Sequence, residues 1–237
     1  MAELRVFEDA GELGAALADE LLDRYEESNG AFLLGCPGGR SLRSTYRALA
    51  EQRPDLARCS IVMMDEYVPT PPTQADHSCR GFAQRHICAP LDVSEERLWV
   101  PDPQDATSYD ERIAAAGGVD VFLLASGSSD GHVGFLPPGS PLDGRTAVVR
   151  LAESTRRDNL KTFPHFRSVD DVPTRGVTVG LATFADSRAL RLVMHGREKQ
   201  EATARLLELA EFDPAWPASI VHEHEDAAIL VDREALP

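Results

Sequence analysis

The sequence predicts an α/β protein: a single domain with a Rossmann-like, doubly wound, mostly parallel sheet and helices on both faces. Apolar strand-like runs alternate with helical patterns along the whole chain of 237 residues. The strand-like runs are continuous stretches of leucine and β-branched residues, as expected of strands that are covered on both faces. No internal repeat, low-complexity tract or linker divides the chain, so we expect one domain over residues 1–237.

The individual elements follow from their local patterns. Strands are expected at 4–7, 31–35, 60–68, 119–126, 146–151, 176–183, 190–196 and 227–232. Helices are expected at 10–28, 41–52, 78–87, 108–118, 197–210 and 217–224. The proline-rich stretch 68–76 reads as an irregular surface loop.

The charge and the apolar runs exclude several classes of partner. The net charge is −15, a surface that repels nucleic-acid backbones, and an anionic substrate would need a local basic pocket. No apolar run reaches the roughly 20 residues of a membrane span, and the first residues show no signal-peptide pattern. We therefore expect neither nucleic acid nor membrane as a partner.

The cysteines and lysines are few. Cys36, Cys59, Cys79 and Cys88 form no Cys-x-x-Cys pair and fit no zinc spacing, which favours reduced thiols in a cytoplasmic protein. Lysine and arginine together number 24, and only two of them are lysines, so 24 − 2 = 22 are arginines. Composition alone favours chance as the reason that two lysines are present.

Three motifs follow predicted strands, at the edge of the sheet where open α/β sheets bind ligands. They are "GCPGGRS" (35–41), "MMDEY" (63–67) and "SGSSDGHVGFLPPG" (126–139). Their meeting at one edge indicates a single site.

The first motif joins a strand to a helix. Gly38 and Gly39 can turn sharply, Ser41 can donate a hydroxyl, and the following helix N-terminus favours an anion. The motif lacks the ending of a nucleotide P-loop and the spacing of a dinucleotide fingerprint, so a mononucleotide or a sugar phosphate fits better. An ordinary strand–helix turn is the alternative.

The other two motifs contain candidate acid–base groups. Asp65 and Glu66 should point to opposite faces, so one can face the cleft with a raised pKa, or both can cap a turn in solvent. Asp130 beside His132 is how a general acid–base pair is oriented, although Asp-Gly is also a common turn.

Two further histidines raise the possibility of a metal site. His222 and His224 are two residues apart, a spacing that does not share a helix face, and no third ligand is obvious. We expect no metal there.

The motifs together resemble the glucosamine-6-phosphate deaminase/isomerase family, which shares its fold with 6-phosphogluconolactonases. The resemblance runs in order from about residue 30 to 232. It includes "PGGRSLRSTYRAL", "MMDEYV", "DHSCRGF", "SDGHVGF", "GSPLDGRT", "STRRDNLKTF", "VPTRGVTVGLAT" and "HGREKQEA".

The resemblance implies roles for the acid–base groups. "MMDEY" matches the family's "MDEY", which makes Asp65 the base that moves a proton between C2 and C1. "SDGH" matches its "NDGH", so Asp130 and His132 correspond to the pair that opens the sugar ring.

The resemblance also implies a phosphate site. The "GGRS" segment, Gly38, Gly39, Arg40 and Ser41, corresponds to the phosphate loop. Lys199 falls on the family's phosphate lysine, and Lys161 falls where the family has a second basic ligand, usually arginine. Both lysines of the chain therefore occupy anion-binding positions, which reverses the preference from composition.

One departure concerns the reaction itself. After "DGH" the deaminase pattern is "IAFNEPG", whose glutamate completes the ring-opening relay, whereas Pro137 stands at that position here. Ring opening must then use Asp130 and His132, use Glu66 or water, or be unnecessary. Lactonases carry the Asp-Gly-His loop without that glutamate, but they usually have arginine where this chain has Tyr67.

The resemblance therefore implies isomerisation and deamination of a 2-amino-2-deoxyhexose 6-phosphate, that is, glucosamine 6-phosphate to fructose 6-phosphate and ammonia. The alternatives are a 6-phosphogluconolactonase and a sugar-phosphate-binding protein without catalysis. We expect a small phosphorylated sugar as the ligand, no cofactor and a cytoplasmic location. A homo-oligomer is one assembly that the sequence allows.

Overall fold

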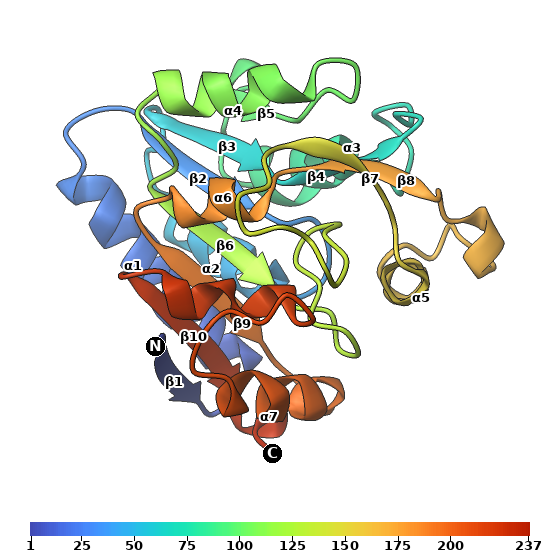
Figure 1. The fold of residues 1–237 in the computed structure, drawn as a ribbon. Coiled ribbons are helices and arrows are strands. Elements are labelled where there is room, and N and C mark those ends of the chain that lie inside the picture. The colour runs from blue at the N-terminus through green and yellow to red at the C-terminus, as the bar shows by residue number, and fades with distance from the viewer.

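The computed structural model describes residues 1–237 and contains two sheets (Figure 1). The larger sheet has seven strands in the order β1-β10-β9-β6-β2-β3-β5, and all of its pairings are parallel. These strands are β1 (Glu3–Phe7), β2 (Phe32–Cys36), β3 (Cys59–Met63), β5 (Leu98–Trp99), β6 (Val121–Ala125), β9 (Leu190–Met194) and β10 (Ala227–Asp232). The smaller sheet is antiparallel, in the order β4 (Asp65–Val68), β8 (Arg175–Thr178) and β7 (Ala147–Arg150).

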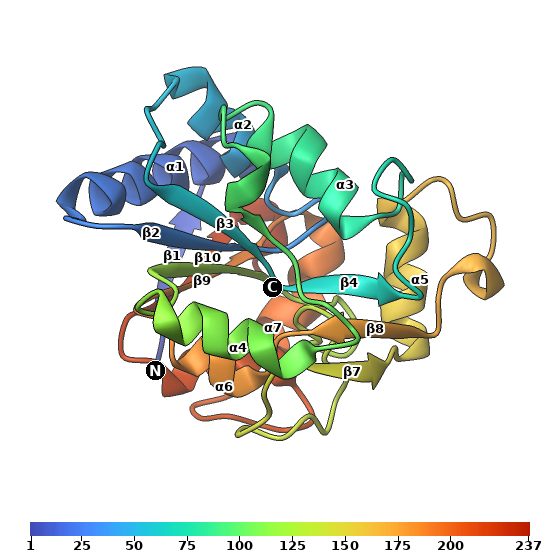
Figure 2. The same cartoon turned by 90° about the horizontal axis from the view of Figure 1, so that it is seen from above.

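Helices cover both faces of the seven-stranded sheet, as Figure 2 shows from above. They are α1 (Ala10–Glu27), α2 (Arg43–Gln52), α3 (Cys79–Ala83), α4 (Ala106–Ala115), α5 (Glu153–Thr162), α6 (Leu181–Ala185) and α7 (Gln200–Glu208). Two apolar cores result, one containing residues of α1, α2 and α3 and the other residues of α4, α6 and α7. The strands alternate between them: Leu34 belongs to the first core and Leu33 to the second. The expected doubly wound, mostly parallel architecture is confirmed.

The second sheet was not expected. The run 60–68 was predicted as one strand, but it divides at Met64, where the chain leaves the large sheet. The Met64 amide still bonds to the Cys36 carbonyl (3.2 Å), whereas its own carbonyl accepts the Val179 amide (2.8 Å) from the small sheet. The single-strand prediction was wrong because hydropathy does not record a change of strand partner.

Other boundaries differ for local reasons. The run 176–183 ends as a strand at Thr178 and continues as α6, so its prediction as one strand was half wrong. Helix α5 was missed because its sequence, "ESTRRDNLKT", has little apolar periodicity and buries only Thr155. The segment 217–224 is a 3₁₀ helix that begins at Pro217. No helix of the protein combines the length and the apolar character that crossing a bilayer requires.

The carboxylate of Glu66 holds β4 against the start of α3. Its side chain is buried, with the residue only 1% exposed. Its oxygens accept four hydrogen bonds, from the amides of Tyr67 (2.9 Å), Cys79 (3.1 Å) and Arg80 (2.9 Å) and from Ser78 Oγ (3.2 Å). A helix of five residues thus begins on a fixed anion, which satisfies amides that the helix itself leaves free.

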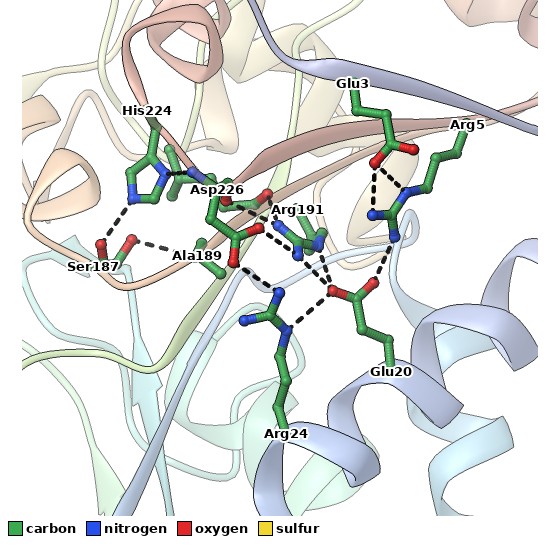
Figure 3. A network of polar contacts seen from close by, with 10 residues as sticks. Glu3, Arg5, Glu20, Arg24, Ser187, Ala189, Arg191, His224 and Asp226 are labelled. Atoms are coloured by element: carbon green, nitrogen blue, oxygen red, sulfur yellow. Dashed lines mark hydrogen bonds and ion pairs between the residues drawn. The ribbon is translucent and has the colours of Figure 1, made fainter. Parts of the chain in front are cut away.

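An ionic network ties α1 to the amino ends of the strands (Figure 3). Arg191 of β9 is only 1% exposed, and it donates to Glu20 of α1 (2.7 Å) and to Asp226 just before β10 (2.8 Å). Arg24 of α1 also donates to Asp226 (2.8 Å). The buried guanidinium is therefore paired with two carboxylates, the condition under which a buried charge is tolerated.

Replacing Glu66 with glutamine tests its anchoring role. Glu66→Gln removes the charge and places an amide donor among four donors, so we expect the free energy of unfolding to fall by about 2–4 kcal/mol. Urea denaturation measures this change. The matched control is Glu95→Gln, because the exposed carboxylate of Glu95 contacts only Gln84 (3.1 Å) and should cost less than about 0.5 kcal/mol. Equal losses in both variants would refute the anchoring role.

Candidate active site

One pocket lies at the carboxyl ends of β2, β3, β6 and β9, the edge where the three sequence motifs were expected to meet. It is a hollow that is partly open to solvent. The loops after these strands form its floor, and α5 contributes residues to its wall. Among its lining residues are Gly38, Gly39, Arg40, Ser41, Asp65, His132 and Lys199. The structure thus brings together most of the predicted site residues.

The glycine-rich loop between β2 and α2 forms one end of the pocket. Gly39 has a φ of +102°, which L side chains rarely adopt, and its Cα lies close to α5, since an added Cβ would be 3.4 Å from Thr162. Helix α2 begins just beyond, and no side chain caps its N-terminus. Free amides of this kind suit an anion.

Lys199 brings a buried cation to the same pocket. It ends a short 3₁₀ turn after β9, is 9% exposed, and donates from Nζ to the Ser126 carbonyl (2.6 Å). Burial lowers the pKa of its ammonium, and the negative charges of Asp158 and Glu198 act in the opposite direction. Burial thus disfavours the ammonium at the floor of the pocket, and the two nearby carboxylates offset part of that effect.

Lys161 lies farther out. It is exposed, is not among the lining residues, and reaches the pocket through Glu198. The Glu198 carboxylate contacts Arg40 (3.1 Å) with one oxygen and Lys161 (3.5 Å) with the other. An acidic side chain thus stands between two of the cations that were predicted to bind phosphate.

Asp65 is the first residue of β4 and faces the pocket. It is 5% exposed, and burial raises the pKa of its carboxyl to about 7; a hydrogen bond with Cys79 opposes this shift, and the charge of Glu66 adds to it. Consecutive strand residues point to opposite faces, so Glu66 points away into its contacts with α3. A carboxyl with a pKa near neutrality can both take and return a proton.

Asp130 and His132 form a second acid–base unit. His132 lines the pocket, and its Nδ1 lies 2.7 Å from Asp130 Oδ1, which also accepts the His132 amide (3.2 Å). Burial would raise the pKa of Asp130, but the hydrogen bonds and charge of His132 and a bond from Ser154 hold it at about 2. The carboxylate therefore stays ionised beside the imidazole.

Small residues make room for this pair. A Cβ on Gly127 would lie 2.1 Å from His132 Nδ1, so only glycine fits there. Gly131 has a φ of +64° and packs against Trp216, while its carbonyl accepts the Ala218 amide (2.8 Å). The glycines of the Asp-Gly-His loop thus serve the close packing of His132 and of the turn at 213–218.

Several lining residues were not predicted. His195 directly follows β9, so the strand-end rule that selected the other motifs would also have found it. Asp158, Asn159 and Thr162 come from α5, which does not follow a strand of the large sheet and shows little periodicity. Periodicity gave no signal for that helix, although the family resemblance had placed Lys161 of the same segment at the phosphate site.

Three residues weighed as alternatives lie outside the pocket. The Glu66 carboxylate accepts four hydrogen bonds at β4 and the start of α3 and does not line the pocket, so it cannot serve ring opening. Tyr67 is fully buried, with its ring centroid 5.0 Å from that of Phe135 and 6.0 Å from that of Phe166, so it packs behind the pocket. Pro137 is not among the lining residues, and its carbonyl accepts the Ser140 hydroxyl (2.7 Å) in a turn.

The remaining sequence candidates have structural partners. His222 contacts the Ala2 amide (3.3 Å) and the Leu206 carbonyl (3.2 Å). His224 contacts the Ser187 carbonyl (2.8 Å) and the Asp226 amide (3.0 Å), as Figure 3 shows. The four cysteines are all free and buried.

This arrangement is typical of an acid–base enzyme with a parallel α/β fold. The carboxyl edge of its sheet carries Asp65, with a pKa near neutrality, the Asp130–His132 pair and, at one end, the ammonium of Lys199. The chain belongs to the family described as glucosamine-6-phosphate isomerases/6-phosphogluconolactonase, whose family model matches residues 8–230. The family resemblance seen in the sequence is thereby confirmed.

Individual relatives agree with this assignment. A glucosamine-6-phosphate deaminase of Bacillus pumilus is 33% identical over 239 residues, which is 97% of this chain and 96% of the relative. The solved structure of a monomeric glucosamine-6-phosphate deaminase is 30% identical, covers 98% of both chains and superimposes with a TM-score of 0.90. A 6-phosphogluconolactonase of Thermotoga maritima, at 20% identity, covers 98% of this chain and 100% of its own with a TM-score of 0.74, which shows the shared fold alone.

The raised pKa of Asp65 predicts a pH-dependent effect on stability. Its folded pKa of about 7 lies above the ordinary value of 3.8, so the folded state holds its proton more tightly and loses stability as the pH rises between these values. Asp65→Asn removes this loss. We expect the variant to be more stable than the native protein above pH 7, with the gain shrinking toward pH 4, as measured by thermal unfolding. Asp143→Asn, at an exposed position, is the control; a gain in Asp65→Asn that does not vary with pH would contradict the shift.

Proposed function

We propose that this protein converts glucosamine 6-phosphate and water to fructose 6-phosphate and ammonia. The observation that carries the proposal is that the buried carboxyl of Asp65 and the imidazole of His132 line one pocket, with His132 Nδ1 held 2.7 Å from Asp130 Oδ1. An aldose–ketose isomerisation needs both units, one to move a proton between carbons and one to open the sugar ring. The names of the relatives that match over nearly the full chain support the same reaction.

His132 and Asp130 act first. The His132 imidazolium donates a proton to the ring oxygen while the bond from that oxygen to C1 breaks, and a water takes the proton of the anomeric hydroxyl and returns it to the imidazole. The Asp130 carboxylate, 2.7 Å away, stabilises the imidazolium and holds the ring in place. Pro137 has no proton to move, so this pair and water carry out ring opening.

Asp65 acts second. Its carboxylate removes the C2 proton of the open-chain aldehyde while the C1 oxygen takes a proton from the substrate's own ammonium, which gives an enolamine. The resulting carboxylic acid of Asp65 then returns the proton to C1. The product is an imine at C2. Water adds to this carbon and ammonia leaves, which gives the ketose. A pKa of about 7 suits a group that must be base and acid in turn.

The phosphate of the substrate lies at the end of the pocket that is formed by the Gly38–Ser41 loop and Lys199. In this proposal the Gly38–Ser41 loop offers amides and the Ser41 hydroxyl, and Lys199 supplies a fixed positive charge. Arg40 and Lys161 approach from the rim, where the phosphate competes with Glu198 for them. These local cations offset the repulsion that a net charge of −15 exerts on an anionic sugar.

Hydrolysis of 6-phosphogluconolactone is the second candidate, and Pro137 is the observation that favours it. A lactone carbonyl is already electrophilic, so His132 would need only to activate one water. The buried position of Tyr67 removes one argument against it, because that side chain does not touch the pocket.

The location and assembly of the protein are also proposals. Four free, buried cysteines support the reducing cytoplasm. A homo-oligomer stays a prediction.

A pair of assays separates the reactions. Purified protein is given glucosamine 6-phosphate with ammonia measured, and separately 6-phosphogluconolactone with acid measured. We expect ammonia release that is abolished in His132→Ala and reduced about 10²–10⁴-fold in Asp65→Asn. Lactone hydrolysis that depends on His132, without ammonia, would replace the first proposal with the second. Binding without either reaction would indicate a sugar-phosphate sensor.

The two lysines should contribute unequally. Lys199→Ala should weaken binding of glucosamine 6-phosphate by about 10- to 150-fold, because a buried charge-assisted contact is lost. Lys199→Arg should not restore it, since a planar fork does not reproduce a point charge. Lys161→Ala, at an exposed position, should cost about fivefold or less. Calorimetric titration of the Asp65→Asn protein measures these affinities without turnover; a larger loss in Lys161→Ala than in Lys199→Ala would reverse the assignment.

A further inference from the structure

Ser154 contacts the Asp–His pair from the side opposite the imidazole. Its hydroxyl donates a hydrogen bond to Asp130 Oδ2, while Asp130 Oδ1 accepts from His132 Nδ1 (2.7 Å) and from the His132 amide (3.2 Å). Each oxygen of the carboxylate therefore has its own donor. Ser154 is the only side chain besides His132 that bonds to this carboxylate.

The carboxylate needs this second contact to hold one orientation. The terminal torsion of an aspartate side chain has broad, shallow minima, so a carboxylate held by one partner can rotate. The His132 amide and Nδ1 share one oxygen and leave the other free to be set by Ser154.

We propose that Ser154 is a positioning residue for His132. By fixing Asp130, its hydroxyl keeps Oδ1 on the imidazole Nδ1, which retains its proton, and leaves Nε2 as the nitrogen that exchanges protons with the ligand. Which nitrogen of a histidine is protonated follows from the hydrogen bond that the other one makes. The catalytic meaning of this role rests on the proposed function, whereas the role itself concerns only the geometry of the imidazole.

Ser154 also links the pair to the pocket wall. It stands in the first turn of α5, and later turns of the same helix supply Asp158, Asn159 and Thr162 to the lining. Thr162 lies against the backbone of Gly39 in the proposed phosphate loop. Helix α5 thus contacts Asp130 through its first turn and the proposed phosphate loop through its last turn. The hydrogen bond of Ser154 therefore also holds the first turn of this helix beside the Asp–His pair.

The test uses three variants and two readouts. Ser154→Ala removes the hydroxyl, Ser154→Thr keeps one, and Ser108→Ala is the control, because Ser108 also stands in the first turn of a helix but bonds only to the Asp105 carbonyl (2.9 Å). The first readout is the ¹⁵N spectrum of the imidazoles, which reports the tautomer; the His132→Gln spectrum identifies the His132 signals. The second is kcat and KM for ammonia release over a range of pH.

We expect a single Nδ1-protonated tautomer for neutral His132 in the native protein, in Ser154→Thr and in Ser108→Ala, and a mixture in Ser154→Ala. We expect kcat in Ser154→Ala to fall roughly 5- to 50-fold with little change in KM, and its pH profile to shift. An unchanged tautomer in Ser154→Ala overturns the proposal, as does an unchanged kcat or a Ser154→Thr variant as defective as the alanine. If the native protein releases no ammonia, the proposed function fails and the tautomer alone decides the role of Ser154.

Discussion

The buried carboxylate of Glu66 is the contact on which the geometry of the site depends. It accepts three hydrogen bonds from the start of α3 and a fourth from the Tyr67 amide of its own strand, and so fixes β4 against that helix. Side chains alternate along a strand, and with Glu66 pointing to α3 its neighbour Asp65 must point to the pocket. The same contact places Cys79, whose thiol touches Asp65, at the edge of that pocket. An anion without a part in proton transfer thereby positions the group that transfers protons.

Two aspartates in this structure differ because their surroundings differ. Asp65 is buried beside another carboxylate and a thiol, and its pKa rises to about 7. Asp130 is also partly buried, but its imidazole partner and two further donors bring its pKa to about 2. The first can exchange a proton near neutral pH and the second remains an anion that orients its partner. Groups of one chemical type with pKa values pushed apart in this way are the mark of divided acid–base roles.

Much of this arrangement could be predicted from the sequence, since the strand ends that carry Gly38, Asp65 and His132 are marked by apolar runs followed by glycine or charge. The parallel sheet and its binding edge follow from the same runs. The division of 60–68 could not be predicted, because Met64 continues the apolar run of β3 and the change lies in the hydrogen-bond partners of its backbone. Helix α5 could not be predicted as a helix for a different reason: Thr155 is its only fully buried residue, so its sequence shows little apolar periodicity, although the resemblance had placed its Lys161 at the phosphate site.

The ionic network around Arg191 lies at the amino ends of the strands, and the pocket lies at their carboxyl ends. The sheet therefore separates two electrostatic tasks, since the ion pairs that clamp α1 share no residue with the groups around the ligand. A substitution in the pocket loops removes none of the ion pairs around Arg191, and a substitution in those ion pairs removes no group that lines the pocket. A change of charge at one end of the sheet therefore leaves the charged groups at the other end in place.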